Sequence, residues 1–146
     1  MDTHVRALKL GSDFIIIFSA TYAGVAGLYY VTINTSNLSV QSLPVLIKAT
    51  GTTAGTYKAG TPFDAIVNSG TLYISYADGT ATGSLYVIAY TVFPTLSVTV
   101  SSATTGAAYG SCLVADATGN IWVGANSGTV ATVSYTHLTL PTNREV

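Results

Sequence analysis

A repeated pair of strand-like segments constrains the fold of this chain more than any other feature. The apolar run Phe14–Phe18 is followed by Gly27–Ile33, and the similar run Thr71–Ser75 is followed by Ser84–Tyr90. A repeat of this length is typical of supersecondary units that stack side by side, because a single unit cannot bury its apolar face alone. The repeat therefore predicts stacked units, and it says nothing about activity.

One alignment superimposes the first two copies. Setting Ile15 on Leu72 also sets Leu28 on Leu85, because both pairs are 57 residues apart. A third and shorter copy is Asn120-Ile-Trp-Val-Gly124, and its first isoleucine follows Leu72 by 49 residues. The shorter spacing indicates a difference in loop length, which repeat architectures accept at little cost.

Strand signals dominate the whole chain. Runs rich in Val, Ile, Tyr and Thr are separated by Gly, Asn, Asp and Ser, and no stretch shows sustained helical periodicity. The predicted strands are Val5–Leu10, Asp13–Ala20, Leu28–Asn34 and Leu38–Leu43, then Phe63–Val67, Thr71–Ala77, Ser84–Thr91 and Leu96–Ser101, then Ser111–Ala115, Asn120–Ala125 and a last strand from Thr129 onward. Each unit is thus expected to be an antiparallel meander.

Four-stranded meanders that recur about every 50 residues favour a β-propeller, in which each meander is one blade. We predict an all-β fold of about two and a half four-stranded antiparallel blades of an incomplete propeller. Blade 1 is expected at about 5–43, blade 2 at about 63–101 and a truncated blade 3 at about 111–132, within one domain spanning 1–132. The alternative is a β-sandwich made from the same strands.

The third copy carries a sharper motif. Asp116-Ala-Thr-Gly-Asn-Ile-Trp-Val-Gly124, closed by Gly128, resembles the repeat of two-component-regulator-type propellers, in which an Asp-x-x-Gly turn feeds an aromatic strand that ends in glycine. The second unit keeps only Asn68-Ser-Gly70, Leu72-Tyr73 and a later Gly83-Ser-Leu-Tyr86, and the first unit departs further. The resemblance implies a propeller blade but no activity, because propellers host many unrelated functions.

Both faces of the strand that contains the only tryptophan are apolar. Trp122 and its expected counterparts Ile16 and Tyr73 lie on one face, whereas Ile121 and Val123 lie on the other. Two apolar faces are typical of a sheet packed between two neighbours. We therefore expect Trp122 to pack between blades rather than to form a sugar-stacking platform.

The C-terminal segment resembles a sequence of non-biological origin. Val133–Thr142 matches, residue for residue, one reading frame of the transposase mosaic-end adapter used in DNA library preparation. Segments foreign to a natural chain are set aside before fold reasoning. We therefore expect residues 133–146 to be a non-native tail and the natural protein to continue beyond Thr132.

The composition excludes several classes of partner. Charged residues make up 8% of the chain and the formal net charge is −1, whereas typical domains carry about 25% charged residues. A nucleic-acid face needs clustered Lys and Arg, and electrostatic attachment to a membrane needs a basic patch, so neither is expected. The run Phe14–Phe18 is too short to span a bilayer as a helix, so no membrane insertion is expected. The neutral, hydroxyl-rich composition is typical of extracellular and virion-associated β proteins, and the alternative is an ordinary β domain with neutral solvent faces.

No pattern in the sequence predicts catalysis. The aspartates stand alone beside turns, where Asp usually accepts bonds from its own backbone, and they do not form the carboxylate pair of a glycosidase. Asp78–Gly83 lacks the repeated acidic ligands of a calcium loop, and no His/Cys cluster has metal-site spacing. Cys112 is expected to be a buried, inert thiol. We predict no catalytic, cofactor-binding or metal-binding residue.

Three tyrosines are the candidate binding residues. Tyr22, Tyr57 and Tyr109 fall in predicted loops, and a loop tyrosine offers a rigid amphipathic ring to a partner. The partner would be an unknown protein or glycan.

These observations lead to two functional hypotheses. The first is a non-enzymatic binding or structural module, a fragment of a propeller on a virion or cell surface. The alternative is a fragment of an extracellular propeller enzyme that acts on glycans with catalytic residues outside this fragment. Missing blades of the same chain are also expected partners, because fewer than three blades cannot close a ring and should leave aggregation-prone strand edges.

Overall fold

The computed structural model describes residues 4–80, 84–91, 93, 98–102, 108–127 and 133–138, with side chains at 4–80, 84–91, 93 and 111–125. The described residues form three antiparallel β-sheets of four, four and three strands. They contain no helix that is long and apolar enough to cross a membrane. The predicted all-β class and the antiparallel meanders are confirmed.

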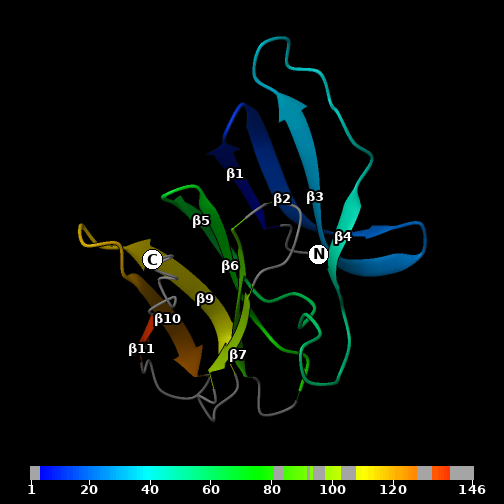
Figure 1. Cartoon of the computed structure of the whole chain (residues 1–146). Helices are drawn as coiled ribbons and strands as arrows, with labels where there is room; N and C mark the ends of the chain where they lie inside the picture. The colour runs from blue at the N-terminus through cyan, green and yellow to red at the C-terminus, as the bar shows by residue number, and fades with distance from the viewer. Residues whose placement is uncertain are drawn as a thin grey trace.

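Each sheet is a meander in which neighbouring strands follow one another in the sequence. The first sheet contains β1 (Val5–Leu10), β2 (Asp13–Tyr22), β3 (Val25–Asn34) and β4 (Val45–Ala49), the second contains β5 (Asp64–Asn68), β6 (Thr71–Ala77), β7 (Leu85–Tyr90) and β8 (Val98–Ser102), and the third contains β9 (Ala108–Ala115), β10 (Ile121–Ser127) and β11 (Val133–Leu138). Figure 1 shows the sheets in chain order, from the blue and cyan strands through the green strands to the orange ones.

The connection between β2 and β3 is tighter than expected. Ala23 and Gly24 both have positive φ, 50° and 81°, as a two-residue type I′ hairpin turn requires. Because this turn matches the twist of the flanking strands, pairing continues up to Tyr22 and resumes at Val25. The strands predicted at Asp13–Ala20 and Leu28–Asn34 were therefore too short at this turn, because β2 continues to Tyr22 and β3 begins at Val25.

The fourth strand of the first sheet lies further along the chain than predicted. Leu38–Leu43 is not a strand, because Leu38 has a φ of 56° and its N–H donates to the carbonyl of Asn34, closing a turn. Leu38 and Leu43 are 69% and 76% exposed. Val40 makes only an isolated bridge to Ile33 of β3. The continuous ladder with β3 is formed by Val45–Ala49, so the first sheet extends to residue 49 rather than 43.

The third sheet also differs in its boundaries. β9 begins at Ala108, inside the segment expected to be a loop. The second partner of β10 is β11, Val133–Leu138, which lies entirely within the adapter-like segment. The described part of the strand predicted from Thr129 is β11, and residues 128–132 lie outside the described part of the chain.

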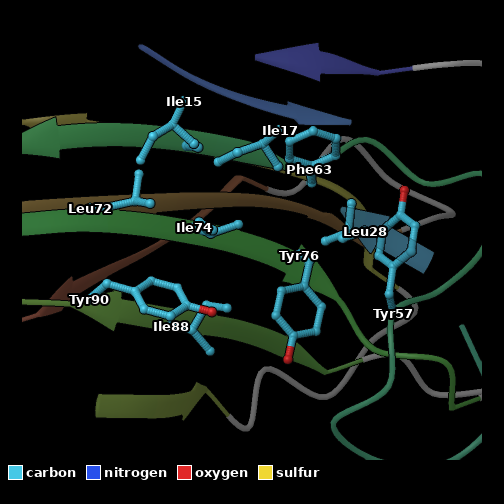
Figure 2. Close-up of a cluster of buried hydrophobic side chains, with 11 residues drawn as sticks. Ile15, Ile17, Leu28, Tyr57, Phe63, Leu72, Ile74, Tyr76, Ile88 and Tyr90 are labelled. Atoms are coloured by element: carbon cyan, nitrogen blue, oxygen red, sulfur yellow. The ribbon is translucent and has the colours of Figure 1, made fainter. Parts of the chain in front are cut away.

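The second sheet is buried on both faces. On one side, Ile15 and Ile17 of β2 pack with Leu72 and Ile74 of β6, and Tyr76 closes the cluster, as Figure 2 shows. All five side chains are at most 1% exposed, and burying each aliphatic one fully contributes about 1.5–3 kcal/mol. This cluster joins the first two sheets.

A second cluster joins the second sheet to the third. Tyr73 of β6 and Val87 of β7 pack with Leu113, Ile121 and Val123 of β9 and β10. Because successive side chains of a strand point to opposite faces, Leu72 and Tyr73 serve different interfaces. The three sheets therefore stack face to face.

The stack has a consistent direction. We call the face of a sheet that is turned away from the preceding sheet and toward the following one its forward face, and the opposite face its backward face. Ile15 lies on the forward face of the first sheet, Tyr73 on that of the second and Trp122 on that of the third. The counterpart of Tyr73 is therefore Ile15, not Ile16 as the alignment predicted.

A one-residue difference in a connection explains this error. Ser19 pairs with Leu28 in the first sheet, and Ala77 pairs with Leu85 in the second. The segment between the paired residues is thus one residue longer in the first unit. Leu28 and Leu85, on β3 and β7, therefore correspond at a separation of 57 residues. Corresponding residues of β2 and β6 are instead 58 residues apart. A slip of one residue moves every side chain of a strand to the other face.

Candidate functional site

Three of the four carboxylates in the described residues are used as structural acceptors. The Asp64 carboxylate is 13% exposed and lies among the first strands of all three sheets. Its Oδ1 accepts hydrogen bonds from Arg6 Nε at 2.6 Å and Ala65 N at 2.9 Å, and its Oδ2 accepts one from Leu113 N at 2.9 Å. Asp64 therefore connects β1, β5 and β9.

Asp78 fixes the connection after β6. It is 1% exposed, and its Oδ1 accepts hydrogen bonds from Thr80 N (3.2 Å), Thr80 Oγ1 (2.6 Å) and Ser84 N (2.8 Å). Its Oδ2 is buried without a hydrogen-bond partner. All three bonds come from the same connection, so Asp78 organises a turn.

Asp116 organises the hairpin of the propeller-like motif. Its Oδ1 accepts hydrogen bonds from Thr118 N, Thr118 Oγ1 and Asn120 N, and its Oδ2 accepts them from Asn120 Nδ2 and Trp122 Nε1, at 2.7–2.9 Å. These donors, Trp122 first among them, hold the pKa of Asp116 well below its usual value. The Asp and the Trp of the motif are thus parts of one closed turn.

Asp13 is the exception. Its carboxylate receives no hydrogen bond or ion pair in the described part of the structure. It lines a cleft of about 330 Å³ between the first and second sheets. The other lining residues are Leu10, Gly11, Ile15, Thr32, Gly70 and Phe93. This cleft is the candidate functional site.

Tight turns open the cleft. The β1–β2 hairpin turns at Gly11 and the β5–β6 hairpin turns at Gly70, which have φ values of 61° and 80°. No atom lies within 4 Å of the position that a Cβ would take at either glycine. Phe93 forms an aromatic wall, because its ring packs edge-on against Tyr30 at 4.7 Å and Tyr90 at 5.4 Å. None of the described residues that line the cleft is cationic.

Tyr57 is buried, whereas the prediction had its side chain exposed in a loop. It is 1% exposed, its ring packs against Tyr76, and its hydroxyl donates to the carbonyl of Thr61. The loop that carries it runs along the second sheet, where Lys58 N donates to Ala77 O at 2.9 Å. Burial raises the pKa of the Tyr57 hydroxyl.

The other two tyrosines have different surroundings. Tyr22 ends β2, is 39% exposed and packs edge-on against Tyr29 at 6.0 Å. Tyr109 lies in β9 rather than in a loop, and its side chain falls outside the described residues. Because Tyr57 is buried, Tyr22 and Tyr57 do not form one binding surface.

Sequence reasoning missed the surface around Cys112. This thiol is exposed rather than buried, because it lies on the forward face of the third sheet with Val114 and Trp122, which are 61% and 39% exposed. Sequence reasoning also missed Asp13, which it treated like the other turn aspartates. The sequence did contain a signal for Asp13. It directly follows a two-residue turn, and such a turn is too short to offer several backbone N–H donors to a carboxylate.

No group of three or more His, Cys, Asp and Glu side chains that could bind a metal occurs among the described residues. The arrangement therefore offers one free carboxylate in a mostly apolar cleft, and two exposed apolar sheet faces. Comparisons with protein-family models, curated proteins and solved structures find no significant match for this chain.

Proposed function

We propose that this chain is a non-enzymatic structural or binding module, with its three sheets as consecutive blades of a β-propeller on a virion or cell surface. The observation that carries the proposal is the second sheet, which is buried on both faces by meanders of the same strand order. Its first strand, β5, contacts the first strands β1 and β9 of its neighbours, as the inner strands of adjacent blades do in a propeller.

The engaged carboxylates favour a structural role over catalysis. Asp64 and Asp116 already accept three and five hydrogen bonds from the protein. A general acid or base must instead reach the proton that it transfers. These two side chains stabilise the stack and the hairpin.

The two end faces of the stack are the proposed binding surfaces. The forward face of the third sheet presents Cys112, Val114 and Trp122, and the backward face of the first sheet presents Val5 and Phe14, which are 51% and 37% exposed. Within the chain, each forward face packs on a backward face. The end faces would therefore bind further blades, the missing blades of the same chain, and in their absence another copy.

Cys112 makes this proposal testable. The rate of Cys112 alkylation and the sedimentation coefficient of the 146-residue chain should be measured over a range of protein concentrations. We expect association to increase with concentration and alkylation to slow, because docking covers the thiol. Val114→Lys should keep the chain monomeric and the alkylation fast, whereas Thr52→Lys, in an exposed loop, should behave as the parent does.

Two results would contradict end-face docking. One is a monomer whose alkylation rate is the same at every concentration. The other is association that Val114→Lys leaves unchanged.

A second candidate is the fragment of an extracellular propeller enzyme that acts on glycans with catalytic residues outside this fragment. The unengaged carboxylate of Asp13 in the cleft is the observation that favours it. Release of reducing ends from a polysaccharide panel distinguishes the two proposals. The structural module is expected to release none, and turnover by a longer natural chain that contains this segment would establish the enzyme.

A further inference from the structure

We propose that the cleft between the first two sheets binds a primary ammonium group on a short aliphatic chain, with Asp13 as its counter-ion. This inference goes beyond the proposed function, because it depends on the cleft and not on whether the sheets are propeller blades. Three features of the cleft suit such a ligand, namely its shape, its unsatisfied charge and its apolar walls.

Side-chain alternation builds one wall of the cleft. Leu10 pairs with Asp13, and Ile15 pairs with Thr32, so these four side chains share the forward face of the first sheet. Gly70 and Phe93 of the second unit lie opposite them. The volume of about 330 Å³ lies at the lower end of the range of small-molecule sites, so the cleft suits a small ligand or one side chain.

Among the described residues, nothing donates a hydrogen bond to the Asp13 carboxylate or forms an ion pair with it. The Asp64 carboxylate has two backbone N–H donors and Arg6, whereas Asp13 is half-buried and has none of these. Removing a carboxylate from water costs free energy unless a donor or an opposite charge replaces the lost hydration. The Thr32 hydroxyl does not donate to Asp13. Its Oγ1 donates to Ser42 Oγ at 3.3 Å, and Ser42 does not line the cleft. A ligand with a donor cation would supply the missing partner.

The walls favour an alkylammonium over a sugar. A sugar needs several convergent polar groups to orient its hydroxyls, but Leu10, Ile15 and Phe93 present only apolar surface. An aliphatic chain gains free energy from that surface at about 25 cal/mol per Å² buried. A cation within about 6 Å of the Phe93 ring would also be attracted to its π face. One carboxylate and apolar walls match one ammonium and a methylene chain.

Two sources could supply this chemistry, a free alkylamine or a lysine side chain of a protein partner. Ligand-observed saturation-transfer NMR on the 146-residue chain can compare them, because the method tolerates a self-associating protein. The probes are n-pentylammonium, 1-pentanol as the neutral match, and an acetylated, amidated lysine peptide. We expect saturation transfer to n-pentylammonium and weaker transfer to 1-pentanol. Tighter binding of the peptide would identify a lysine side chain as the ligand, and tighter binding of the amine would identify a free amine.

Asp13→Asn provides the decisive variant. It keeps the shape of the cleft and should weaken n-pentylammonium binding by about tenfold or more, the loss expected for a charged hydrogen bond. Thr52→Lys changes the net charge by the same amount at an exposed position outside the cleft lining, and it should leave binding unchanged. Thr32→Ile narrows the cleft while keeping the carboxylate, and it should also weaken binding.

The proposal is overturned if 1-pentanol binds as well as n-pentylammonium. It is also overturned if Asp13→Asn and Thr32→Ile both bind n-pentylammonium as the parent does. Should Asp13→Asn fail to fold, Thr32→Ile and the comparison of the two probes decide the question. A negative result here leaves end-face docking intact, because Cys112 alkylation reports on a different surface.

Discussion

The Asp64 carboxylate accepts a hydrogen bond from the backbone N–H of Leu113, with 2.9 Å between Oδ2 and N. The two residues belong to β5 and β9, which lie in different sheets. Because Oδ1 of the same carboxylate accepts from Arg6 of β1, one side chain connects three sheets that the backbone ladders leave separate.

Replacing Asp64 should cost far more stability than replacing its ionic partner. Asp64→Ala leaves the buried N–H of Leu113 without an acceptor, which should lower the free energy of unfolding by about 1–3 kcal/mol. The side chain of Arg6 is 50% exposed, so Arg6→Ala should cost only about 0–1 kcal/mol. Urea unfolding of the two variants gives the comparison, and equal losses would show that the ion pair, not the backbone bond, stabilises the stack.

Acid should release the Asp116 hairpin only well below the usual range of an aspartate. Its folded-state pKa is lowered, so its contribution to stability is present above the unfolded value of about 3.9 and is lost as the pH falls through the folded pKa. Trp122 is the only tryptophan, and its Nε1 donates to Asp116. Its fluorescence should stay constant from pH 7 down through the usual aspartate value of about 3.9 and change only well below it.

Asp116→Asn is the control for this experiment. An amide cannot titrate, and its NH₂ group opposes the Trp122 N–H, so the variant should lose the acid transition and unfold more easily at neutral pH. An unchanged acid transition in Asp116→Asn would show that another group controls the fluorescence.

Alkali should unfold the chain through its buried tyrosines. Burial raises the pKa of Tyr57, Tyr76 and Tyr90 in the folded state. Their contribution to stability is present below the unfolded value of about 10 and is lost as the pH rises through the folded values. Absorbance at 295 nm should therefore show some tyrosines ionising only when circular dichroism reports unfolding. Complete, reversible ionisation near pH 10 with the sheet signal intact would contradict their burial.

The close approach of two loops should make Gly79 intolerant of a side chain. A Cβ at Gly79 would lie 1.8 Å from the carbonyl oxygen of Gly51, which is backbone and cannot move aside cheaply. Gly79→Ala should therefore cost at least the upper part of the about 1–3 kcal/mol range of overpacking. Gly55→Ala adds a methyl group in open space at a φ of 80°, so it should cost only about 1–2 kcal/mol. The urea midpoint of Gly79→Ala should therefore be lower than that of Gly55→Ala. The reverse order would mean that the two loops are further apart than in the structure.

Some of the fold could be predicted closely because its causes are local. Val5–Leu10 and Thr71–Ala77 were expected with the bounds that the structure has, since strand-forming runs end at turn residues in both cases. The local sequence pattern did not predict the position of the fourth strand, because the residues of Leu38–Leu43 are as typical of a strand as those of Val45–Ala49. The turn at Leu38 and pairing with β3 decide between them.

The candidate site could not be predicted in the same way. Asp13, Asp64 and Asp116 all follow or precede turns in the sequence, yet only the structure shows which carboxylates find donors. Only one of the three donors to Asp64, Ala65 N, is adjacent in the sequence. The other two lie 58 residues before it and 49 residues after it, so no local pattern predicts them. The cleft itself lies between two sheets, so the sequence pattern of neither sheet alone predicts it.

The sequence by itself determined that the chain forms consecutive antiparallel strands with two apolar faces, because alternation and turn residues act over a few neighbouring positions. The tertiary structure decided which face meets which sheet, which tyrosines are buried and which aspartate stays free. Tyr57 shows the reason. Its burial depends on Tyr76 and on a loop pinned along β6, and such contacts exist only after separate sheets have packed together.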